Sequence, residues 1–324
     1  MKRREVLAVG LGAALPWRSA SAQPRFPERP VQLLVPFPPG GDGDMIGRLW
    51  AKHAAPYLAG NVVVENRAGA SGAIGVAEVA RSRGEGGHTL LLGTTTTQII
   101  LPAAQSAAQY DALKDFVLVG MLSVTATCIV VNPKVPARSL KELVALLKAN
   151  PGKYSYGSAG HGTITNLTGE LFKLQAGKLD VLHVPYKGGG PAMQDLVAGH
   201  IPITTPILSS AVLAQHRAGR ARILGVNSDE RVKAAPDIPT SMEAGVPGMH
   251  VEVFSAVFAP ADTPWHAVEH LRQATVKLRA EPAFLQDLEK AGAEPFAHPS
   301  EQKFFAEEAA RWAHIIKATG FKAQ

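Results

Sequence analysis

Short apolar runs alternate with stretches of helical periodicity along most of this chain. Apolar runs at 31–36, 61–65 and 89–93 end at Pro, Gly or Asn, and the stretches between them, at 45–58 and 72–83, carry apolar residues at helical spacing. Alternating strand and helix patterns of this kind are typical of βαβ units. The pattern therefore predicts an α/β fold with mostly parallel sheets.

A second alternating series begins near residue 127. Its predicted strands lie at 129–131, 154–157, 181–185, 201–205 and 222–226, and its predicted helices begin near Ser139, Thr163 and Pro191. Ser139 and Glu142 stand three apart, as in a capping box that satisfies the first amides of a helix. The chain then runs through a predicted return strand at 251–258 into three predicted helices, at 265–279, 282–290 and 301–319.

This order predicts two α/β lobes, the second inserted into the first. Lobe 1 comprises residues 23–128 and 252–324, and lobe 2 comprises residues 129–251. The division agrees with the size of the chain, because about 300 residues exceed what a single hydrophobic core usually supports. The chain would cross between the lobes near residues 128 and 252, and a cleft is expected between them.

The first 22 residues have the features of a signal peptide. Basic residues at 2–4 precede a short apolar core at 6–15, and Ala20-Ser21-Ala22 provides an A-x-A cleavage site. The Arg pair also fits a twin-arginine signal, so the Sec and twin-arginine routes both stay open. The mature protein is expected to begin at Gln23 and to reside in the periplasm. No later run of about 18 apolar residues predicts a membrane-spanning helix.

The charge balance argues against nucleic-acid binding. The whole chain has 33 basic and 27 acidic residues, a formal net charge of +6. Without the signal peptide, 29 basic and 26 acidic residues remain, a net charge of +3, and no long basic run is interleaved with aromatic residues. The lone Cys128 excludes an intrachain disulfide and, in its apolar run, is expected to be a buried structural residue.

Four loops rich in glycine or hydroxyl side chains follow predicted strands, at 36–44, 93–97, 156–163 and 187–191. Ligands of open α/β sheets gather at the carboxyl ends of the strands. Such loops present neutral donors, and helix N-termini carry partial positive charge that suits an anion. The loop at 156–163 is the preferred anion site, through Ser158, Thr163 and the amides between them. The alternative is that both hydroxyls only cap the following helix.

Other binding and catalytic motifs fail on spacing. No G-x-x-x-x-G-K-[ST] motif occurs, and Asp42 and Asp44 in the first loop would repel phosphate. The carboxylates of Asp42 and Asp44 lack the spacing of an EF-hand calcium site, and the chain has no H-E-x-x-H zinc motif. Asp44 is expected to pair with Arg48 one helical turn later. Ser158 lacks the G-x-S-x-G context of hydrolases because position 156 is Tyr. A hydrolase that uses Ser158 with a histidine stays open as an alternative.

Seven ordered motifs resemble one protein family. They are Pro27-Glu-Arg-Pro30, Val35-Pro-Phe-Pro-Pro-Gly-Gly41 with Asp44 and Arg48, Val63-Val-Glu-Asn-Arg-Ala-Gly-Ala-Ser-Gly72, Tyr156-Gly-Ser-Ala-Gly160, Val184-Pro-Tyr-Lys-Gly188, Pro236-Asp-Ile-Pro-Thr240 with Glu243-Ala-Gly245, and Ala259-Pro260 with Thr263-Pro264. Together they span essentially the whole mature chain and are similar to the solute-binding proteins of tripartite tricarboxylate transporters, the TctC-like Bug family. The resemblance implies a type II periplasmic binding protein fold, with two α/β lobes joined by two crossover strands around a ligand cleft.

The resemblance also implies a ligand, a small organic carboxylate, and the residues that hold it. In relatives, one carboxylate lies between the first strand–helix loop and the Ser-Ala-Gly helix start, partly through ordered water. By position, the residues implied in ligand binding are Phe37, Pro39, Gly40, Gly41, Thr94, Thr95, Thr96, Ser158, Ala159, Gly160, Gly162, Thr163, Asn166 and Pro206. No catalytic residue, metal or cofactor is implied.

Two departures from the family pattern affect the expected ligand. Asn166 stands where a His is common, and Thr205-Pro206 stand where many relatives have an aromatic residue and an Asp. In some members that Asp reads the distal, sometimes amino-bearing part of the ligand. Its absence here favours a carboxylate without an amino group.

The sequence therefore predicts a monomeric periplasmic solute-binding protein rather than an enzyme. It would capture a small organic carboxylate by lobe closure and deliver it to the membrane subunits of a tripartite transporter, without spanning the membrane itself. A receptor that reports its ligand to a sensor protein is the alternative partnership. The Ser158 hydrolase is the alternative activity.

Overall fold

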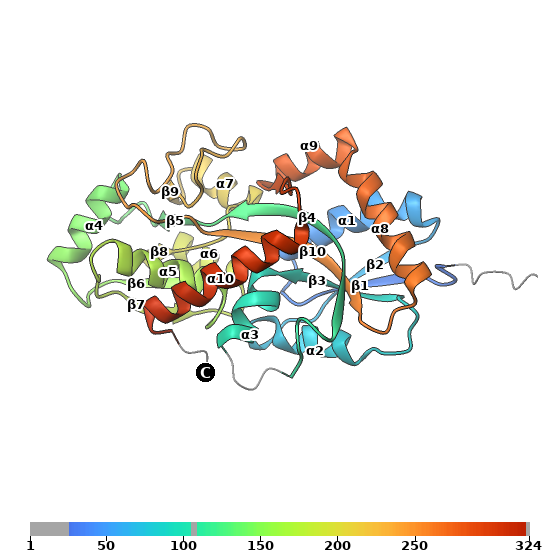
Figure 1. The fold of residues 1–324 in the computed structure, drawn as a ribbon. Coiled ribbons are helices and arrows are strands. Elements are labelled where there is room, and N and C mark those ends of the chain that lie inside the picture. Colours follow the sequence, from blue (N-terminus) through green and yellow to red (C-terminus); the bar gives the residue numbers. More distant parts are fainter. Residues whose placement is uncertain (1–25, 105–108, 322–324) are drawn as a thin grey trace, which may run out of the picture.

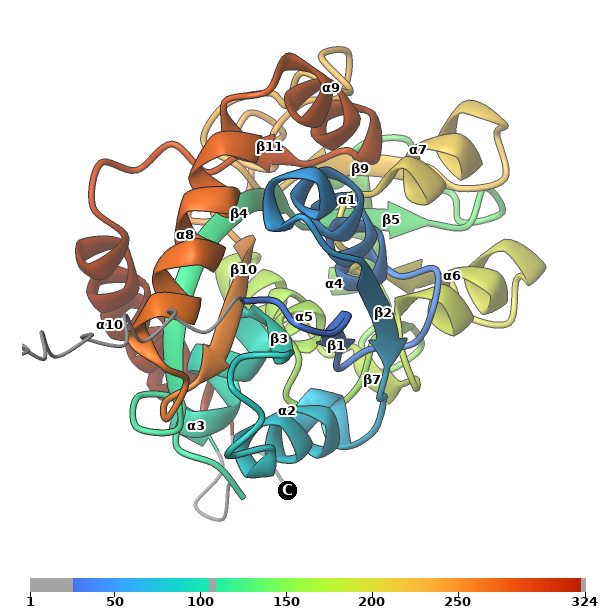
Figure 2. The same cartoon turned by 90° about the vertical axis from the view of Figure 1, so that its right-hand side faces the viewer.

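The computed structural model describes residues 26–104 and 109–321 and shows two α/β lobes side by side (Figure 1). The predicted signal peptide, residues 1–22, lies outside the described residues. Each lobe is built on its own sheet, with helices packed against both faces (Figures 1 and 2). The predicted two-lobed α/β class is confirmed.

Lobe 1 contains a six-stranded sheet in the order β11-β4-β10-β3-β1-β2. Its strands are β1 (Val31–Val35), β2 (Val62–Asn66), β3 (Thr89–Thr94), β4 (Phe116–Ala126), β10 (Glu252–Pro260) and β11 (Glu294–Pro295). β1 runs parallel to β2 and β3, whereas β10 runs antiparallel to β3 and β4. The expected mostly parallel sheet is therefore wrong here: the return strand β10 enters from lobe 2 and runs against its neighbours.

Two helical layers enclose this sheet. Helices α1 (Asp42–Leu58), α8 (Trp265–Arg279) and α9 (Pro282–Ala291) share one core with alternate strand residues such as Leu33. Helices α2 (Ala73–Arg81) and α10 (Glu301–Thr319) share the other core with the intervening residues such as Leu34, and α3 (Leu101–Ala104) leads out of β3. Successive strand residues point to opposite faces, so an apolar run of this type needs cover on both sides.

Lobe 2 contains a five-stranded sheet in the order β7-β6-β8-β5-β9. Its strands are β5 (Cys128–Val131), β6 (Ser155–Ser158), β7 (Leu182–Pro185), β8 (Ile203–Thr204) and β9 (Arg222–Val226), and its helices are α4 (Leu140–Ala149), α5 (Ile164–Gln175), α6 (Gly189–Ala198) and α7 (Ser210–Arg217). The predicted cap of α4 is confirmed, because the Ser139 side chain accepts the Glu142 amide at 3.2 Å. Cys128 is buried and free, as expected.

Two segments join the lobes. The chain passes from β4 through Thr127 into β5, and it returns from β9 through Asn227 and Val251 into β10. The Asn227 amide donates to the Thr127 carbonyl at 2.8 Å, and the Thr127 amide donates to the Val251 carbonyl at 2.9 Å. Asn227 Nδ2 also donates to Thr127 Oγ1 at 2.9 Å. The change of sheet lies close to the two predicted crossings, while the lobe boundaries at 128/129 and 251/252 stay predictions.

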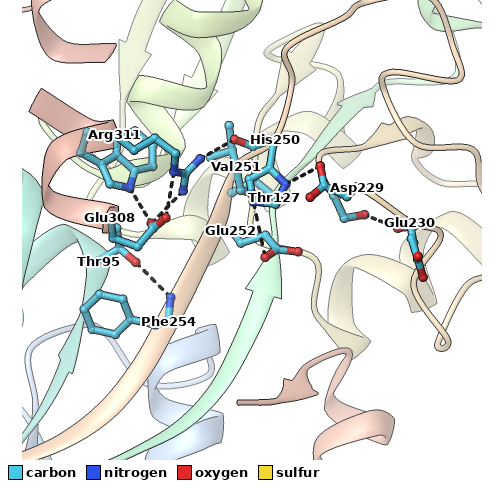
Figure 3. A network of polar contacts seen from close by, with 12 residues as sticks. Thr95, Thr127, Asp229, Glu230, His250, Val251, Glu252, Phe254, Glu308 and Arg311 are labelled. Atoms are coloured by element: carbon cyan, nitrogen blue, oxygen red, sulfur yellow. Dashed lines mark hydrogen bonds and ion pairs between the residues drawn. The ribbon is translucent and has the colours of Figure 1, made fainter. Parts of the chain in front are cut away.

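Helix α10 braces this junction (Figure 3). Arg311 Nη1 donates to the carbonyl of His250, beside the return strand, at 2.7 Å. The same guanidinium binds Glu308 at 2.7 and 2.8 Å, and the fully buried Trp312 donates to that carboxylate at 3.1 Å. The carboxyl-terminal helix is therefore tied to the point where the chain re-enters lobe 1.

Strand β4 and helix α7 have no counterpart among the predicted elements. Strand β4 has 11 residues, pairs with β10 along its length and is largely buried on both faces, so no alternation of apolar and polar residues marks it. Helix α7 is short and begins after Ser209, whose side chain accepts the Val212 amide at 3.4 Å. β4 leads into the junction between the lobes and α7 lines the cavity, so the predicted elements left out part of both regions.

Candidate functional site

A cavity of about 280 Å³ lies between the lobes. Its lobe 1 wall comes from the β1–α1 loop and from residues of β3 and β10, and its lobe 2 wall comes from the start of α5, the β7–α6 loop, α6 and α7. The lining is mainly apolar, with a few polar groups that converge on the cavity. Pockets for drug-sized ligands usually measure roughly 300–1,000 Å³, so this cavity suits a small molecule.

Asp44 holds the β1–α1 loop in place. Its Oδ2 accepts the Gly40 amide at 2.9 Å, its Oδ1 accepts Asn66 Nδ2 at 2.9 Å, and Arg48 forms an ion pair with it at 2.9 Å. Burial opposes the charge of this carboxylate, but the bonds from Arg48, Gly40 and Asn66 hold its pKa below the usual value. The predicted Asp44–Arg48 pair is confirmed. Gly40 has φ of +77°, a conformation that glycine adopts without strain.

Two helices begin at the cavity, and no side chain caps the N-terminus of either helix. The N-cap of α1 is Gly41 and the N-cap of α6 is Gly188, and neither supplies a side chain to the first-turn amides. Both glycines and the residues that follow them line the cavity, one helix from each lobe. Uncapped first-turn amides carry partial positive charge and are donors that a ligand can use. Such a pair of N-termini suits an anion.

The loop at 158–163 uses its own donors internally. The Ala159 amide donates to Thr165 Oγ1 at 2.9 Å, the Gly160 amide to Ser158 Oγ at 3.2 Å, and the Gly162 amide to Asn166 Oδ1 at 3.1 Å. These groups are therefore committed to the protein. The interpretation of this loop as the preferred anion site stays a prediction, and in this structure side chains of the loop and of α5 accept those three amides.

Thr163 is a helix cap. Its side chain accepts the Asn166 amide at 3.3 Å, and its Oγ1 donates to the Gly160 carbonyl at 2.7 Å. Of the two alternatives for this hydroxyl, capping is the one the structure supports, although Thr163 also borders the cavity.

The structure brings nine of the fourteen predicted residues to the cavity wall. They are Phe37, Pro39, Gly40, Gly41, Thr94, Thr96, Ala159, Thr163 and Pro206. The other five are absent from the wall of this cavity. Thr95 Oγ1 accepts the Phe254 amide, Asn166 Nδ2 donates to Tyr156 Oη, and Ser158, Gly160 and Gly162 take part in the loop bonds described above. These five support the site but do not line this cavity.

Several lining residues missed by the binding prediction come from α1, α6 and α7, and others come from β10, from the start of α5 and from the loop before α7. Asp42 belongs to the first loop, and residues 188–191 were recognised as a ligand-type loop without being assigned to the site. Met193 and Gln194 of α6 and Gln215 of α7 complete the lobe 2 wall. The glycines before Pro191 were an available signal, whereas α7 had none because the helix itself was not predicted.

Within the described part of the chain, two side-chain polar atoms in the cavity wall are buried without any hydrogen-bond partner: Thr94 Oγ1 and Asp42 Oδ2. Thr94 is 3% exposed, at the end of β3. Burial raises the pKa of Asp42 to about 7. Most buried polar groups in folded proteins have a partner, and at these two positions in the cavity wall a ligand can supply it.

The unpartnered hydroxyls continue from Thr94 into lobe 1. Ser255 lies opposite Thr94 in the β10–β3 register and opposite Ser123 in the β10–β4 register. Both serines are fully buried, and neither Oγ has a partner among the described residues. Residues directly opposite on neighbouring strands share a face of the sheet. A row of buried hydroxyl side chains, Thr94, Ser255 and Ser123, therefore runs from the cavity across β3, β10 and β4.

Among the residues that the structure describes, no Lys, Arg or His lines the cavity, and Asp42 is the only charged residue in its wall. Across residues 26–104 and 109–321, no group of three or more His, Cys, Asp or Glu side chains is placed to hold a metal ion. An anion in this cavity would be held by neutral donors and helix N-termini.

Direct contacts connect the lobes beside the cavity. Thr96 Oγ1 accepts the Ile164 amide at 3.0 Å, and Ser71 Oγ donates to the His161 carbonyl at 2.6 Å. On the other side of the cleft, Ser210 Oγ lies 3.7 Å from Met45 Sδ. The two lobes are thus closed on each other around the cavity.

We predict that Thr163→Val destabilises the fold without weakening the binding of a carboxylate. The variant loses the cap of α5, which typically contributes about 0.5–2 kcal/mol. Chemical denaturation of the unliganded protein measures the stability change, and titration calorimetry measures the affinity. A loss of affinity of about tenfold or more at unchanged stability would instead make the hydroxyl a ligand donor.

No helix in the described part of the chain is both long and apolar enough to cross a membrane.

The chain also resembles proteins of known structure. It is similar to the periplasmic binding protein BugD, with 31% identity, a TM-score of 0.85, and coverage of 92% of this chain and 100% of that one.

Two further structures contain ligands. Rpa4515 of R. palustris with adipate is 31% identical, with a TM-score of 0.87 over 92% of this chain and 99% of that one. MatC (Rpa3494) from Rhodopseudomonas palustris with bound malate is 28% identical, with a TM-score of 0.82 over 90% of this chain and 100% of that one. Both bound molecules are small carboxylates.

A family model confirms the resemblance seen in the sequence. The model of the tripartite tricarboxylate transporter family receptor, TctC, matches residues 46–321. This match runs through both lobes and includes most of the cavity wall. The chain belongs to the TctC family of tripartite tricarboxylate transporter receptors, whose solved relatives include periplasmic solute-binding proteins.

Proposed function

We propose that this protein captures a small organic carboxylate in the periplasm and delivers it to the membrane subunits of a tripartite transporter. The observation that carries the proposal is the cavity between the lobes, where Thr94 Oγ1 and two uncapped helix N-termini converge without a basic side chain in the described wall. Adipate in Rpa4515 and malate in MatC support a carboxylate as the ligand class. The signal peptide at 1–22, with export by the Sec or twin-arginine route, is part of the proposal.

The ligand carboxylate is expected to bind on the lobe 1 side of the cavity. Thr94 Oγ1 donates one hydrogen bond, and the first-turn amides of α1 after Gly41 donate others. The ring of Phe37 and the backbone of Pro39 and Gly40 border that position. From lobe 2, the first-turn amides of α6 approach the same ligand. The remaining predicted residues, such as Thr95, Ser158 and Asn166, position this wall from behind.

Neutral donors suit a transport receptor. They bind an anion without a buried ion pair, so the complex can open again and release its ligand. Because the walls come from both lobes, a ligand makes all its contacts only in the closed form and shifts the population toward that form. The polar junction at Thr127 and Asn227 is the segment about which this motion is expected.

A hydrolase remains the second candidate because of one specific contact. Ser158 Oγ lies 2.7 Å from His183 Nε2, and burial lowers the pKa of His183 to about 4, so the imidazole is neutral and can accept a proton. However, Ser158 is only 1% exposed and does not line the cavity. A nucleophile needs access to substrate. We therefore assign the pair a structural role in the loop before α5 and propose binding without turnover.

A ligand panel with the mature chain from Gln23 tests the proposed function. It contains mono-, di- and tricarboxylates, aromatic carboxylates and amino acids, with neutral sugars as controls. A ligand at 100 times its dissociation constant stabilises the folded state by about 2.7 kcal/mol, which raises the melting temperature by a few degrees. We expect a shift from one class of carboxylates. Responses only to sugars or cations would contradict the proposal, and formation of product that Ser158→Ala abolishes would support the hydrolase.

The protein partner is identified in an experiment separate from the test of ligand binding. Affinity capture with the ligand-loaded protein is expected to retain the membrane subunits of a tripartite transporter. Capture of a sensor domain in their place would make this chain a receptor for signalling, with the same cavity and the same ligand.

A further inference from the structure

The side chain of Asp42 borders the cavity and takes no part in the proposed function. It stands in the first turn of α1, directly after the N-cap Gly41. Its Oδ2 is shielded from solvent and has no hydrogen-bond partner among the described residues, and Asp42 borders the cavity. The neighbouring Asp44 differs in each respect, because its carboxylate is bound by Arg48, Asn66 and the Gly40 amide. Asp44 supports the loop, whereas Asp42 is left for a ligand.

The charges around Asp42 determine what it can accept. Among the described residues, the parts of the wall that come from β3, β10, α5, α6 and α7 contain no basic and no acidic residue. On its own helix, the nearest ion pair is Asp44 with Arg48, which is already formed. A carboxylate in such surroundings gains a charge-assisted bond from a donor that the ligand brings. It repels a second carboxylate of the ligand unless one of the two groups takes up a proton.

We propose that Asp42 is the specificity-determining residue of this cavity and that the ligand presents a hydrogen-bond donor, an ammonium or hydroxyl group, to its Oδ2. This inference rests on the proposed function, in which a separate carboxylate of the ligand binds near Thr94. It defines the ligand class as a small carboxylate with a donor on its body. It also reverses the expectation from the sequence that an amino group is disfavoured, because the structure places an acid in the cavity at a different position.

Two matched series of acids test the inference, with the terminal group as the only variable. The first is butanoate, 4-hydroxybutanoate, 4-aminobutanoate and succinate, and the second is hexanoate, 6-hydroxyhexanoate, 6-aminohexanoate and adipate. Titration calorimetry at pH 8, where Asp42 is mainly ionised, gives the affinity of wild type and Asp42→Asn for each acid. The control is Asp237→Asn, the same change at an exposed carboxylate outside the cavity wall.

In at least one series, we expect wild type to bind the hydroxyl- or ammonium-bearing acid at least tenfold more tightly than the diacid. Asp42→Asn removes that preference and binds the diacid more tightly than wild type does, while Asp237→Asn retains the wild-type order. Affinity of wild type for the diacid should rise as the pH falls from 8 to 6, because protonated Asp42 no longer repels it. The Asn variant, checked by its circular dichroism and melting temperature, should lack this dependence.

The outcomes separate this inference from the proposed function. Binding of some acids with the same order of terminal groups in wild type and Asp42→Asn overturns the role of Asp42 and leaves carboxylate capture intact. The absence of binding by every acid in both series and in the wider panel overturns carboxylate capture, and the inference with it. An Asn variant that does not fold is replaced by Asp42→Ser, which removes the charge with a smaller side chain and is judged by the same order of terminal groups.

Discussion

Gly188→Ala is expected to weaken carboxylate binding by about 10–100-fold. A Cβ atom at Gly188 would lie 2.9 Å from Cγ and 3.3 Å from Cδ of Pro38, whose rigid ring belongs to the opposite lobe. Real Cβ atoms essentially never approach another atom to within 2.9 Å, so one of the two residues must shift, and because they belong to opposite lobes we expect the lobes to move apart. Each 1.4 kcal/mol by which the closed form is disfavoured reduces affinity about tenfold. Titration calorimetry with the best carboxylate from the panel measures the loss.

A matched glycine separates this clash from backbone strain. Gly188 has φ of +125°, so alanine there is strained in the open and closed forms alike. Gly245 has φ of +92° and lies outside the cavity wall, and a methyl group added there would meet nothing within 4 Å. Gly245→Ala should therefore lose stability but keep its affinity. Equal affinities for the two alanine variants would contradict a closed form that depends on contact between Pro38 and Gly188.

Thr94→Val should lower the affinity for a carboxylate by about 10–100-fold, with little change in the stability of the unliganded protein. Hydrogen bonds to charged groups contribute about 1.5–3 kcal/mol, and valine has nearly the same shape as threonine. Because Thr94 Oγ1 has no partner in the described part of the protein, its removal breaks no internal bond there. Calorimetry gives the affinity, and denaturant unfolding without ligand gives the stability.

Thr125→Val is the control for Thr94→Val. Thr125 is 2% exposed and its hydroxyl is also unpartnered among the described residues, but it does not line the cavity. This control should leave affinity unchanged. If Thr94→Val bound the carboxylate as wild type does, Thr94 would not be a ligand donor, and the anion would have to sit elsewhere in the cavity.

The sequence was informative where the apolar pattern is set by burial alone. β1, β9, α8 and α10 begin at the predicted residues, because Pro, Gly or a capping residue interrupts each pattern at or near its boundary. β4 escaped prediction because a run that is apolar on both faces shows neither helical spacing nor alternation. The combination of parallel and antiparallel strands in the sheet was not predicted either, since the direction of a strand depends on where the chain re-enters a lobe.

The site was predictable only in part. The glycine and threonine loops at strand ends do converge on one cavity, as the order of elements implies. For the loop at 158–163, the sequence cannot show whether a donor faces a ligand or its own helix, and the structure shows three of its amides bonded to side chains of the loop and of α5. From the sequence, Asp42 was interpreted as a group that repels phosphate and, with Asp44, as a carboxylate pair without the spacing of a metal site. The shielding of its Oδ2 and the lack of a partner for that atom are properties of the folded structure and are invisible in the sequence.

The most direct measurement is a crystal structure of the mature protein with the carboxylate that gives the largest thermal shift. Our account predicts a carboxylate in the cavity between the lobes, with one oxygen within hydrogen-bond distance of Thr94 Oγ1. Its other contacts should come from first-turn amides of α1 and from α6 of the opposite lobe. A carboxylate bound to one lobe alone, or in a different pocket, would contradict the proposed mechanism of capture by lobe closure.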